Sequence, residues 1–189
     1  MEIKSVHDST MQYGVVSRLN HWIGALFVLL LLGIGLYFDN MPRGSEKHFW
    51  LRMHVAIGTV AIFFLGFRVF WRMVSTSPLS ISKHRPLQYA SRLVHALLLI
   101  GITTLIMSGP LMIWSMGHPF GIFDFIFVSS PFPPFESWHD ALEQAHEWAA
   151  NIMLCLIIVH LLAVLKHQFI DRDGILARMT GRNTLKSRP

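Results

Sequence analysis

The feature that most constrains this chain is a series of four apolar segments, each long enough to cross the hydrocarbon layer of a lipid bilayer. They cover residues 18–38, 52–74, 91–114 and 146–167. An α-helix of about 20 apolar residues spans that layer, and it satisfies its own backbone hydrogen bonds in lipid. The composition agrees, because 52% of the residues are hydrophobic and only 14% are charged, which is too apolar for an ordinary soluble domain. The sequence therefore predicts an all-α membrane protein, a bundle of four transmembrane helices that forms one domain over residues 1–189.

Lysine and arginine are divided unevenly between the two sides of this predicted bundle. If the N-terminus is cytoplasmic, thirteen basic residues fall on the cytoplasmic side and three on the outer side. The thirteen are Lys4, Arg18, Arg68, Arg72, Lys83, Arg85, Arg92, Lys166, Arg172, Arg178, Arg182, Lys186 and Arg188, and the three are Arg43, Lys47 and Arg52. Basic residues are enriched in cytoplasmic segments, so both termini are predicted to be cytoplasmic. The formal charge of +5 then reflects orientation, and we expect no nucleic-acid partner.

Histidines are placed at two depths of the predicted bundle. His146 and His160 bracket the fourth segment, and their spacing of fourteen residues is about 40° short of four full turns, so both project from nearly the same face, about 21 Å apart. On other helices, His21 lies at the inner level and His54 at the outer level. We expect the pairs His21–His160 and His54–His146 to form two bis-imidazole sites stacked across the membrane. Such axial nitrogen ligands suit haem iron, and helix bundles build such sites from facing side chains.

Other residues fit the same two levels. Arg68 lies on the second helix at inner depth, where it either pairs with a haem propionate or serves as a positive anchor at the cytoplasmic side. Gly35 and Gly109 would leave room for a flat cofactor, although small residues also serve helix packing. His95 is left without a matching histidine, and we expect it to hydrogen-bond to a propionate or a quinone.

Other interpretations of these histidines are open. His139 could replace His146 as a ligand, but it falls in the segment "ESWHDALEQ", outside the apolar block. A structural zinc ion needs four ligands around one centre, which two pairs about 21 Å apart cannot supply. A proton path is conceivable because intramembrane histidines mark relays, but it lacks the acidic residues usually found alongside. Covalent haem is not expected, because the single cysteine, Cys155, is not part of a CxxCH motif.

The motifs of this chain, in their order and spacing, resemble those of the bacterial cytochrome b561 proteins over about residues 13–182. They are "YGVVSRLNHW", "LRMHVAIG" with "FRVFWR" downstream, the histidine pair of the fourth segment, and "LKHQFIDRDGILARMTGR". The resemblance implies four helices, two non-covalent b haems and electron exchange with quinone in the bacterial inner membrane. It also implies residue roles: His21, His54, His146 and His160 match the haem-ligand positions, and His167 matches a position associated with quinone near the inner haem.

The function implied by this resemblance is electron transfer across the inner membrane between an outer-side donor and the quinone pool, with ubiquinone the expected acceptor near His167, Lys166 and Arg68. Some relatives oxidise superoxide at the outer face, so superoxide:ubiquinone oxidoreductase is one expected activity. The alternative is a cytochrome b electron-transfer subunit that serves a periplasmic or membrane redox protein. The sequence does not decide between an enzyme and a carrier, and it assigns no catalytic residue.

The long segment 115–145 is the expected docking region for an outer donor. It contains the aromatic, proline-broken stretch "GIFDFIFVSSPFPPF", and we expect part of it to lie along the membrane surface. Lys47 and Arg52, beside His54, would attract a small anion, although ordinary loop charge explains them equally well.

Overall fold

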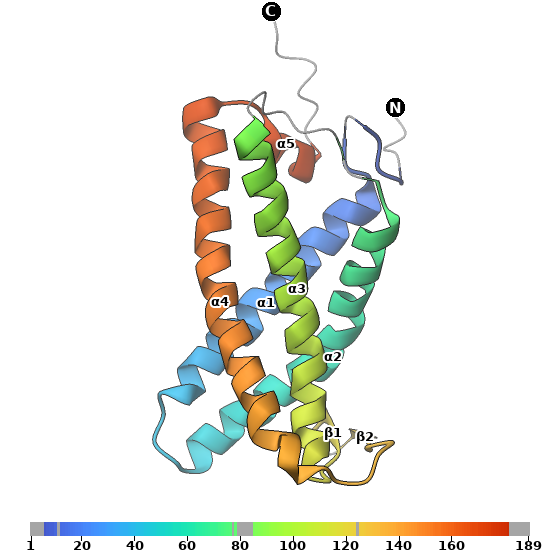
Figure 1. The fold of residues 1–189 in the computed structure, drawn as a ribbon, viewed down its shortest axis with the longest axis vertical. Coiled ribbons are helices and arrows are strands. Elements are labelled where there is room, and N and C mark those ends of the chain that lie inside the picture. Colours follow the sequence, from blue (N-terminus) through green and yellow to red (C-terminus); the bar gives the residue numbers. More distant parts are fainter. Residues whose placement is uncertain (1–5, 11, 77, 79–84, 124, 182–189) are drawn as a thin grey trace, which may run out of the picture.

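A computed structural model of the protein describes residues 6–10, 12–76, 78, 85–123 and 125–181. Within these residues, four long helices run alternately up and down: α1 (Val15–Asp39), α2 (Ser45–Val74), α3 (Arg85–Ser115) and α4 (His139–Leu165). The N-terminal ends of α1 and α3 and the C-terminal ends of α2 and α4 lie at the end of the bundle that holds both chain termini (Figure 1). We call this the terminus end, and we call the opposite end the hairpin end.

All four helices are long and apolar enough to cross a membrane. Their outward faces carry large exposed apolar side chains such as Leu26, Phe63 and Leu162, a surface that suits lipid and not water. The predicted bundle of four transmembrane helices is therefore confirmed. The predicted cytoplasmic location of the termini stays a prediction, and five of the basic residues behind it lie outside the described residues: Lys4, Lys83, Arg182, Lys186 and Arg188.

The helices extend beyond the apolar segments, mainly at their polar ends. Helix α2 begins at Ser45, α3 at Arg85 and α4 at His139, six or seven residues before the corresponding apolar segment. Hydropathy marks only the part of a helix with lipid-like composition, whereas backbone hydrogen bonds continue into turns that are polar. Helix α4 ends in a π-helical turn, η2 (Lys166–Asp171), which leads to the short helix α5 (Ile175–Thr180). Trp22 of α1 donates a hydrogen bond to the Met179 carbonyl, 3.1 Å away, and ties α5 to α1.

The connection between α3 and α4 is more regular than predicted. Strands β1 (Phe120–Ile122) and β2 (Ile126–Val128) form a small antiparallel hairpin, with Phe120 paired to Val128, and the 3₁₀ turn η1 (Glu136–Trp138) precedes α4. The strictly all-α prediction missed this hairpin, because two three-residue strands are too short to show an alternating pattern. Strand β1 packs against α2, while the side chains of β2 are exposed.

The buried core lies at mid-height of the bundle. It is centred on Ala61 and Leu65 of α2, Ile102 of α3 and Met153 of α4. Met153 is seven residues from each histidine that brackets the apolar run of α4 and is almost fully buried. A Cβ atom on Gly101 of α3 would lie 2.6 Å from the Met153 Cε atom, so the glycine allows this close contact. The core therefore separates the two levels at which the histidines lie.

Candidate functional site

Four of the predicted histidines lie together in two pairs, one at each end of the bundle. The ring centroids of His21 and His160 are 6.5 Å apart at the terminus end, and those of His54 and His146 are 6.3 Å apart at the hairpin end. A metal ion about 2 Å from one nitrogen of each of two imidazoles would hold their centroids roughly 6 Å apart. Both pairs therefore have the separation that axial ligation of one iron requires.

The hairpin-end pair has a hydrogen-bond arrangement that leaves one nitrogen available for a metal. Ser108 Oγ on α3 donates to the Thr104 carbonyl at 2.7 Å and lies 2.9 Å from Nδ1 of His146. Because the single hydroxyl hydrogen goes to the carbonyl, the serine oxygen accepts from His146, whose Nδ1 then carries the hydrogen. The lone pair of Nε2 remains for a metal ion, and an outer partner of this kind is common for histidines that bind metals.

His54, the other member of the hairpin-end pair, is tightly enclosed. Nδ1 of His54 is buried and makes no hydrogen bond of ordinary geometry, although the Leu31 backbone carbonyl interacts with the ring. A Cβ atom on Gly35 would lie 3.5 Å from Cε1 of His54, and one on Gly109 would lie 3.5 Å from Cε1 of His146. The two glycines therefore lie directly beside the imidazoles, and the small residues expected at this level line the site.

A half-buried cation lies beside the terminus-end pair. Arg68 donates from Nη2 to Nδ1 of His21 at 3.2 Å and from Nη1 to the Asn20 carbonyl at 3.4 Å. No carboxylate forms an ion pair with Arg68 among the residues that the structure describes, and a partly desolvated charge without an opposite charge is costly. To bind a metal through Nε2, His21 must carry its hydrogen on Nδ1 and give up the bond from Arg68. The freed guanidinium would then suit an acidic group such as a haem propionate.

A third imidazole lies at the terminus end. The His95 ring is 5.4 Å from the His160 ring, centroid to centroid, and its Nδ1 lies 3.4 Å from Ser91 Oγ. Depth along α3 indicated this level, but the sequence did not indicate contact with His160. His21 and His95 thus both border His160.

His139 occupies a different environment from the paired histidines. Its Nδ1 lies 3.0 Å from Ser115 Oγ and 3.2 Å from the Met112 carbonyl, at the junction of α3 and α4. His146, about two turns further along α4, is the histidine whose ring lies beside that of His54. The geometry therefore favours His146 over His139 as the partner of His54.

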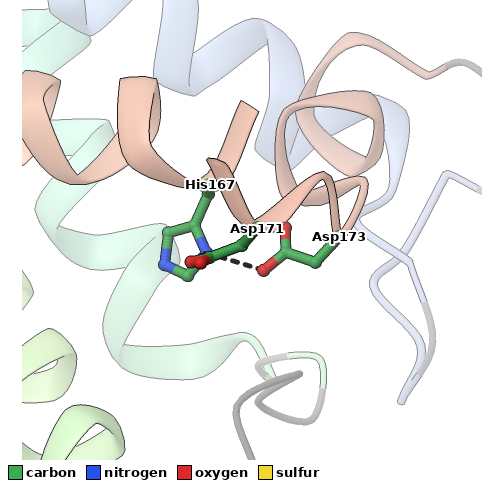
Figure 2. A group of neighbouring side chains, drawn as sticks. All are labelled: His167, Asp171 and Asp173. Carbon is green, nitrogen blue, oxygen red and sulfur yellow. Dashed lines mark hydrogen bonds and ion pairs between the residues drawn. The ribbon is translucent and has the colours of Figure 1, made fainter. Parts of the chain in front are cut away.

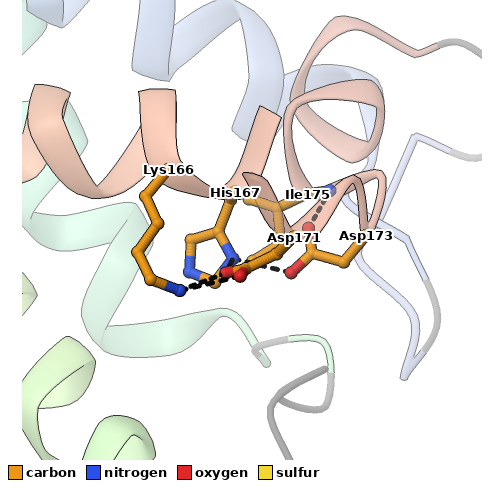
Figure 3. Close-up of polar contacts among 5 residues, drawn as sticks. All are labelled: Lys166, His167, Asp171, Asp173 and Ile175. Carbon is orange, nitrogen blue, oxygen red and sulfur yellow. Dashed lines mark hydrogen bonds and ion pairs between the residues drawn. The ribbon is translucent and has the colours of Figure 1, made fainter. Parts of the chain in front are cut away.

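His167 lies beyond the terminus-end pair, in a cluster of charged side chains. Its Nδ1 is 2.6 Å from Asp173 Oδ2 and 3.2 Å from Asp171 Oδ2 (Figure 2). Lys166 Nζ donates to Asp171 Oδ1 at 2.8 Å (Figure 3). The sequence predicted Lys166 and His167 at this end but neither aspartate. The spacing of four residues between His167 and Asp171 is a signal that could have indicated that contact, whereas Asp173, six residues after His167, is not placed by helical spacing.

The basic residues near the hairpin end differ in their surroundings. Lys47 donates to the carbonyls of Asp39 and Met41, at 3.2 and 3.3 Å. Arg52 lies over the Phe123 ring, with the guanidinium carbon 5.9 Å from its centroid. The side chains around Arg52 form a shallow cavity of about 360 Å³, lined by Ser45, His48, Phe49, Arg52 and Phe123.

Two comparisons with known proteins relate this arrangement to a family. A family model described as prokaryotic cytochrome b561 matches residues 12–182. Cytochrome b561 homolog 2 of Escherichia coli (strain K12) is similar to this chain, with 29% identity over 187 residues that cover 95% of this chain and 97% of that protein. The residues matched by the family model contain all four long helices and both histidine pairs.

Proposed function

We propose a function from the premise that this chain belongs to the prokaryotic cytochrome b561 family. Membership makes it a multi-pass bacterial membrane protein that binds b-type haem and takes part in electron transfer. Our proposal is that it carries electrons across the inner membrane, between a donor at the hairpin end and quinone at the terminus end. The observation that carries this proposal is the presence of two imidazole pairs at opposite ends of one bundle.

Two non-covalent haems are proposed, one for each pair. His54 and His146 would hold one iron, and His21 and His160 the other. Haem iron with two imidazole ligands supplies one-electron redox chemistry, tuned by hydrogen bonds and burial. The two levels on α4 are about 21 Å apart, and the buried apolar core between them excludes water from the path.

Nearby side chains would orient the ligands and balance charge. Ser108 fixes the tautomer of His146 by accepting its Nδ1 hydrogen. Arg68 would neutralise an acidic group of the terminus-end haem, because it is half-buried and its described hydrogen-bond partners are uncharged. His95 would donate a hydrogen bond at the same level, either to a propionate or to a quinone.

The quinone is proposed to bind at the terminus end, beside Lys166, His167 and Arg68. His167 is seven residues after His160, which places it about two turns, or roughly 10 Å, further along the chain. The excess of lysine and arginine at this end supports a cytoplasmic location for it, so the hairpin end would face the periplasm. We expect ubiquinone as the acceptor.

The outer donor has two candidates. A cavity lined by Ser45, His48 and Arg52 lies at the same end of the bundle as His54 and offers a guanidinium to a small molecule. A positive group at this end favours a small anion, and this supports superoxide as the donor. The alternative, a periplasmic or membrane redox protein, would dock on the segment between α3 and α4, and the protein would then be an electron-transfer subunit.

One experiment tests the proposal and separates these donors. Purified, haem-loaded protein is mixed with superoxide from an enzymatic source, and reduction of a short-chain ubiquinone analogue is followed optically. Superoxide-dependent quinone reduction is the expected result. Inertness to superoxide, with quinone reduction after chemical reduction of the haems and co-purification of a periplasmic redox protein, would favour the subunit role. No quinone reduction from reduced haems would contradict the proposed acceptor.

A further inference from the structure

A histidine–aspartate pair lies at the terminus end of α4. After the π-helical turn, the chain reverses through Arg172 and Gly174, which both have positive φ values, 51° and 78°. This reversal returns Asp173 to His167, with 2.6 Å between Nδ1 and Oδ2 (Figure 2). Two residues that are six positions apart thus form a direct hydrogen bond outside the two histidine pairs.

The Asp173 carboxylate is held from both sides. Its Oδ1 accepts a hydrogen bond from the backbone N–H of Ile175 at 3.2 Å, at the start of α5 (Figure 3), while Oδ2 accepts from His167. An ionised carboxylate only accepts hydrogen bonds, so Nδ1 of His167 carries a hydrogen. The reactive nitrogen of the ring is then Nε2, which lies on the side of the ring away from Asp173 in Figure 2.

A second carboxylate, that of Asp171, and the ammonium group of Lys166 lie beside this pair. Asp171 lies 3.2 Å from Nδ1 of His167 and also binds Lys166. The ammonium group of Lys166 compensates the charge of Asp171, so Asp173 is the carboxylate whose described partners are His167 and a backbone N–H.

We infer that Asp173 is a positioning residue that presents Nε2 of His167 as the proton donor for quinone reduction at the terminus end. The inference rests on the quinone reaction of the proposed function. A histidine so placed suits this role because it exchanges protons near neutral pH. Its side chain is 28% exposed, so water at this end of the bundle can return a proton to it.

Quinone becomes quinol by taking two electrons and two protons. The two electrons come singly from the outer donor, which loses one electron each time. Each proton leaves Nε2 of His167 as an O–H bond forms at a quinone oxygen, and a proton from water then restores the N–H bond. Asp173 keeps its charge throughout and holds the ring in place.

The test compares two electron acceptors in the full-length, haem-loaded protein after chemical reduction. A short-chain ubiquinone analogue takes electrons and protons, whereas ferricyanide takes one electron and no proton. The variants are His167→Gln, Asp173→Asn and Asp173→Glu. We expect the Gln and Asn variants to lose roughly tenfold or more in quinone reduction, while ferricyanide reduction and haem content stay unchanged. Asp173→Glu keeps the carboxylate and should restore most of the quinone rate.

Three outcomes would overturn the inference. Quinone reduction by Asp173→Asn at the wild-type rate would show that the carboxylate is not needed. Equal losses with both acceptors would indicate a structural role. Quinone reduction that stops on adding EDTA would make the three side chains ligands of a divalent cation. If wild-type protein reduces ferricyanide but not quinone, the proposed function itself fails and the inference falls with it.

Discussion

Ser108 on α3 accepts a hydrogen bond from His146 on α4, with 2.9 Å between Oγ and Nδ1. The same hydroxyl donates to the Thr104 carbonyl, so its orientation is fixed by its own helix. One short polar side chain on α3 thereby determines which nitrogen of His146 carries the hydrogen and leaves Nε2 with a free lone pair. Helix α3, which supplies neither member of the hairpin-end pair, still controls its chemistry.

Replacing Ser108 by alanine should weaken haem binding at the hairpin end. His146 would lose the acceptor of its Nδ1 hydrogen, and loss of such an outer partner typically lowers metal affinity by about 10- to 100-fold. The rate of haem transfer to apomyoglobin measures this loss. Thr103→Ala is the matched control, because the Thr103 hydroxyl donates to the Leu99 carbonyl of its own helix. Equal transfer rates in both variants would show that Ser108 does not support the ligand.

Replacing Arg68 by glutamine should lower the midpoint potential of the terminus-end haem. Reduction adds a negative charge to the haem, and a half-buried guanidinium nearby would stabilise that charge, so its removal should shift the potential down by about several tens of millivolts. Arg68→Lys, which keeps the charge, should shift it less. A spectroscopic redox titration of the three proteins measures the change, and a raised potential in the Gln variant would contradict this electrostatic role.

Alanine variants of the two histidines that border His160 should differ in haem content. Loss of His21 should remove or alter the terminus-end haem, because its ring centroid lies 6.5 Å from that of His160, the separation that a shared iron requires. His95→Ala should retain both haems, since this ring is the closer at 5.4 Å and leaves less room for an iron. The opposite pattern, measured by the visible spectrum, would make His95 the ligand.

Replacing Gly101 by alanine should destabilise the middle of the bundle. The added Cβ would lie 2.6 Å from Met153 Cε, in a core where overpacking costs about 1–3 kcal/mol. Gly33→Ala is the control, because nothing lies within 4 Å of a Cβ at that position and alanine favours a helix over glycine. Thermal unfolding in detergent should give a lower midpoint for the Gly101 variant than for the control. A midpoint equal to that of Gly33→Ala would mean that Met153 moves aside without cost.

Much of this architecture follows from hydropathy and helical spacing. The four apolar segments predicted the spans, and the interval between His146 and His160 placed them on one face at two levels. Positions at the same depth on other helices were enough to identify His21 and His54 as candidate partners. These inferences work because a helix has a fixed rise and rotation per residue and because the bilayer fixes its length.

The contacts that orient the site depend on features that spacing does not encode. Ser108 meets His146 only because of how α3 is rotated against α4, which is a property of side-chain packing. Asp173 reaches His167 through a chain reversal with left-handed backbone at Arg172 and Gly174, which helical periodicity cannot predict. The β1–β2 hairpin was missed because its strands, of three residues each, are too short to show an alternating pattern.

The haem-to-protein ratio, measured with the visible spectrum, tests the two-level account most directly. Wild-type protein should contain two b-type haems per chain. His146→Ala should lose or alter the hairpin-end haem and His160→Ala the terminus-end haem, so that the two variants affect different spectral components, while His139→Ala should keep both. If His146→Ala and His160→Ala both retained two unperturbed haems, the assignment of these histidines to two separate sites would be wrong.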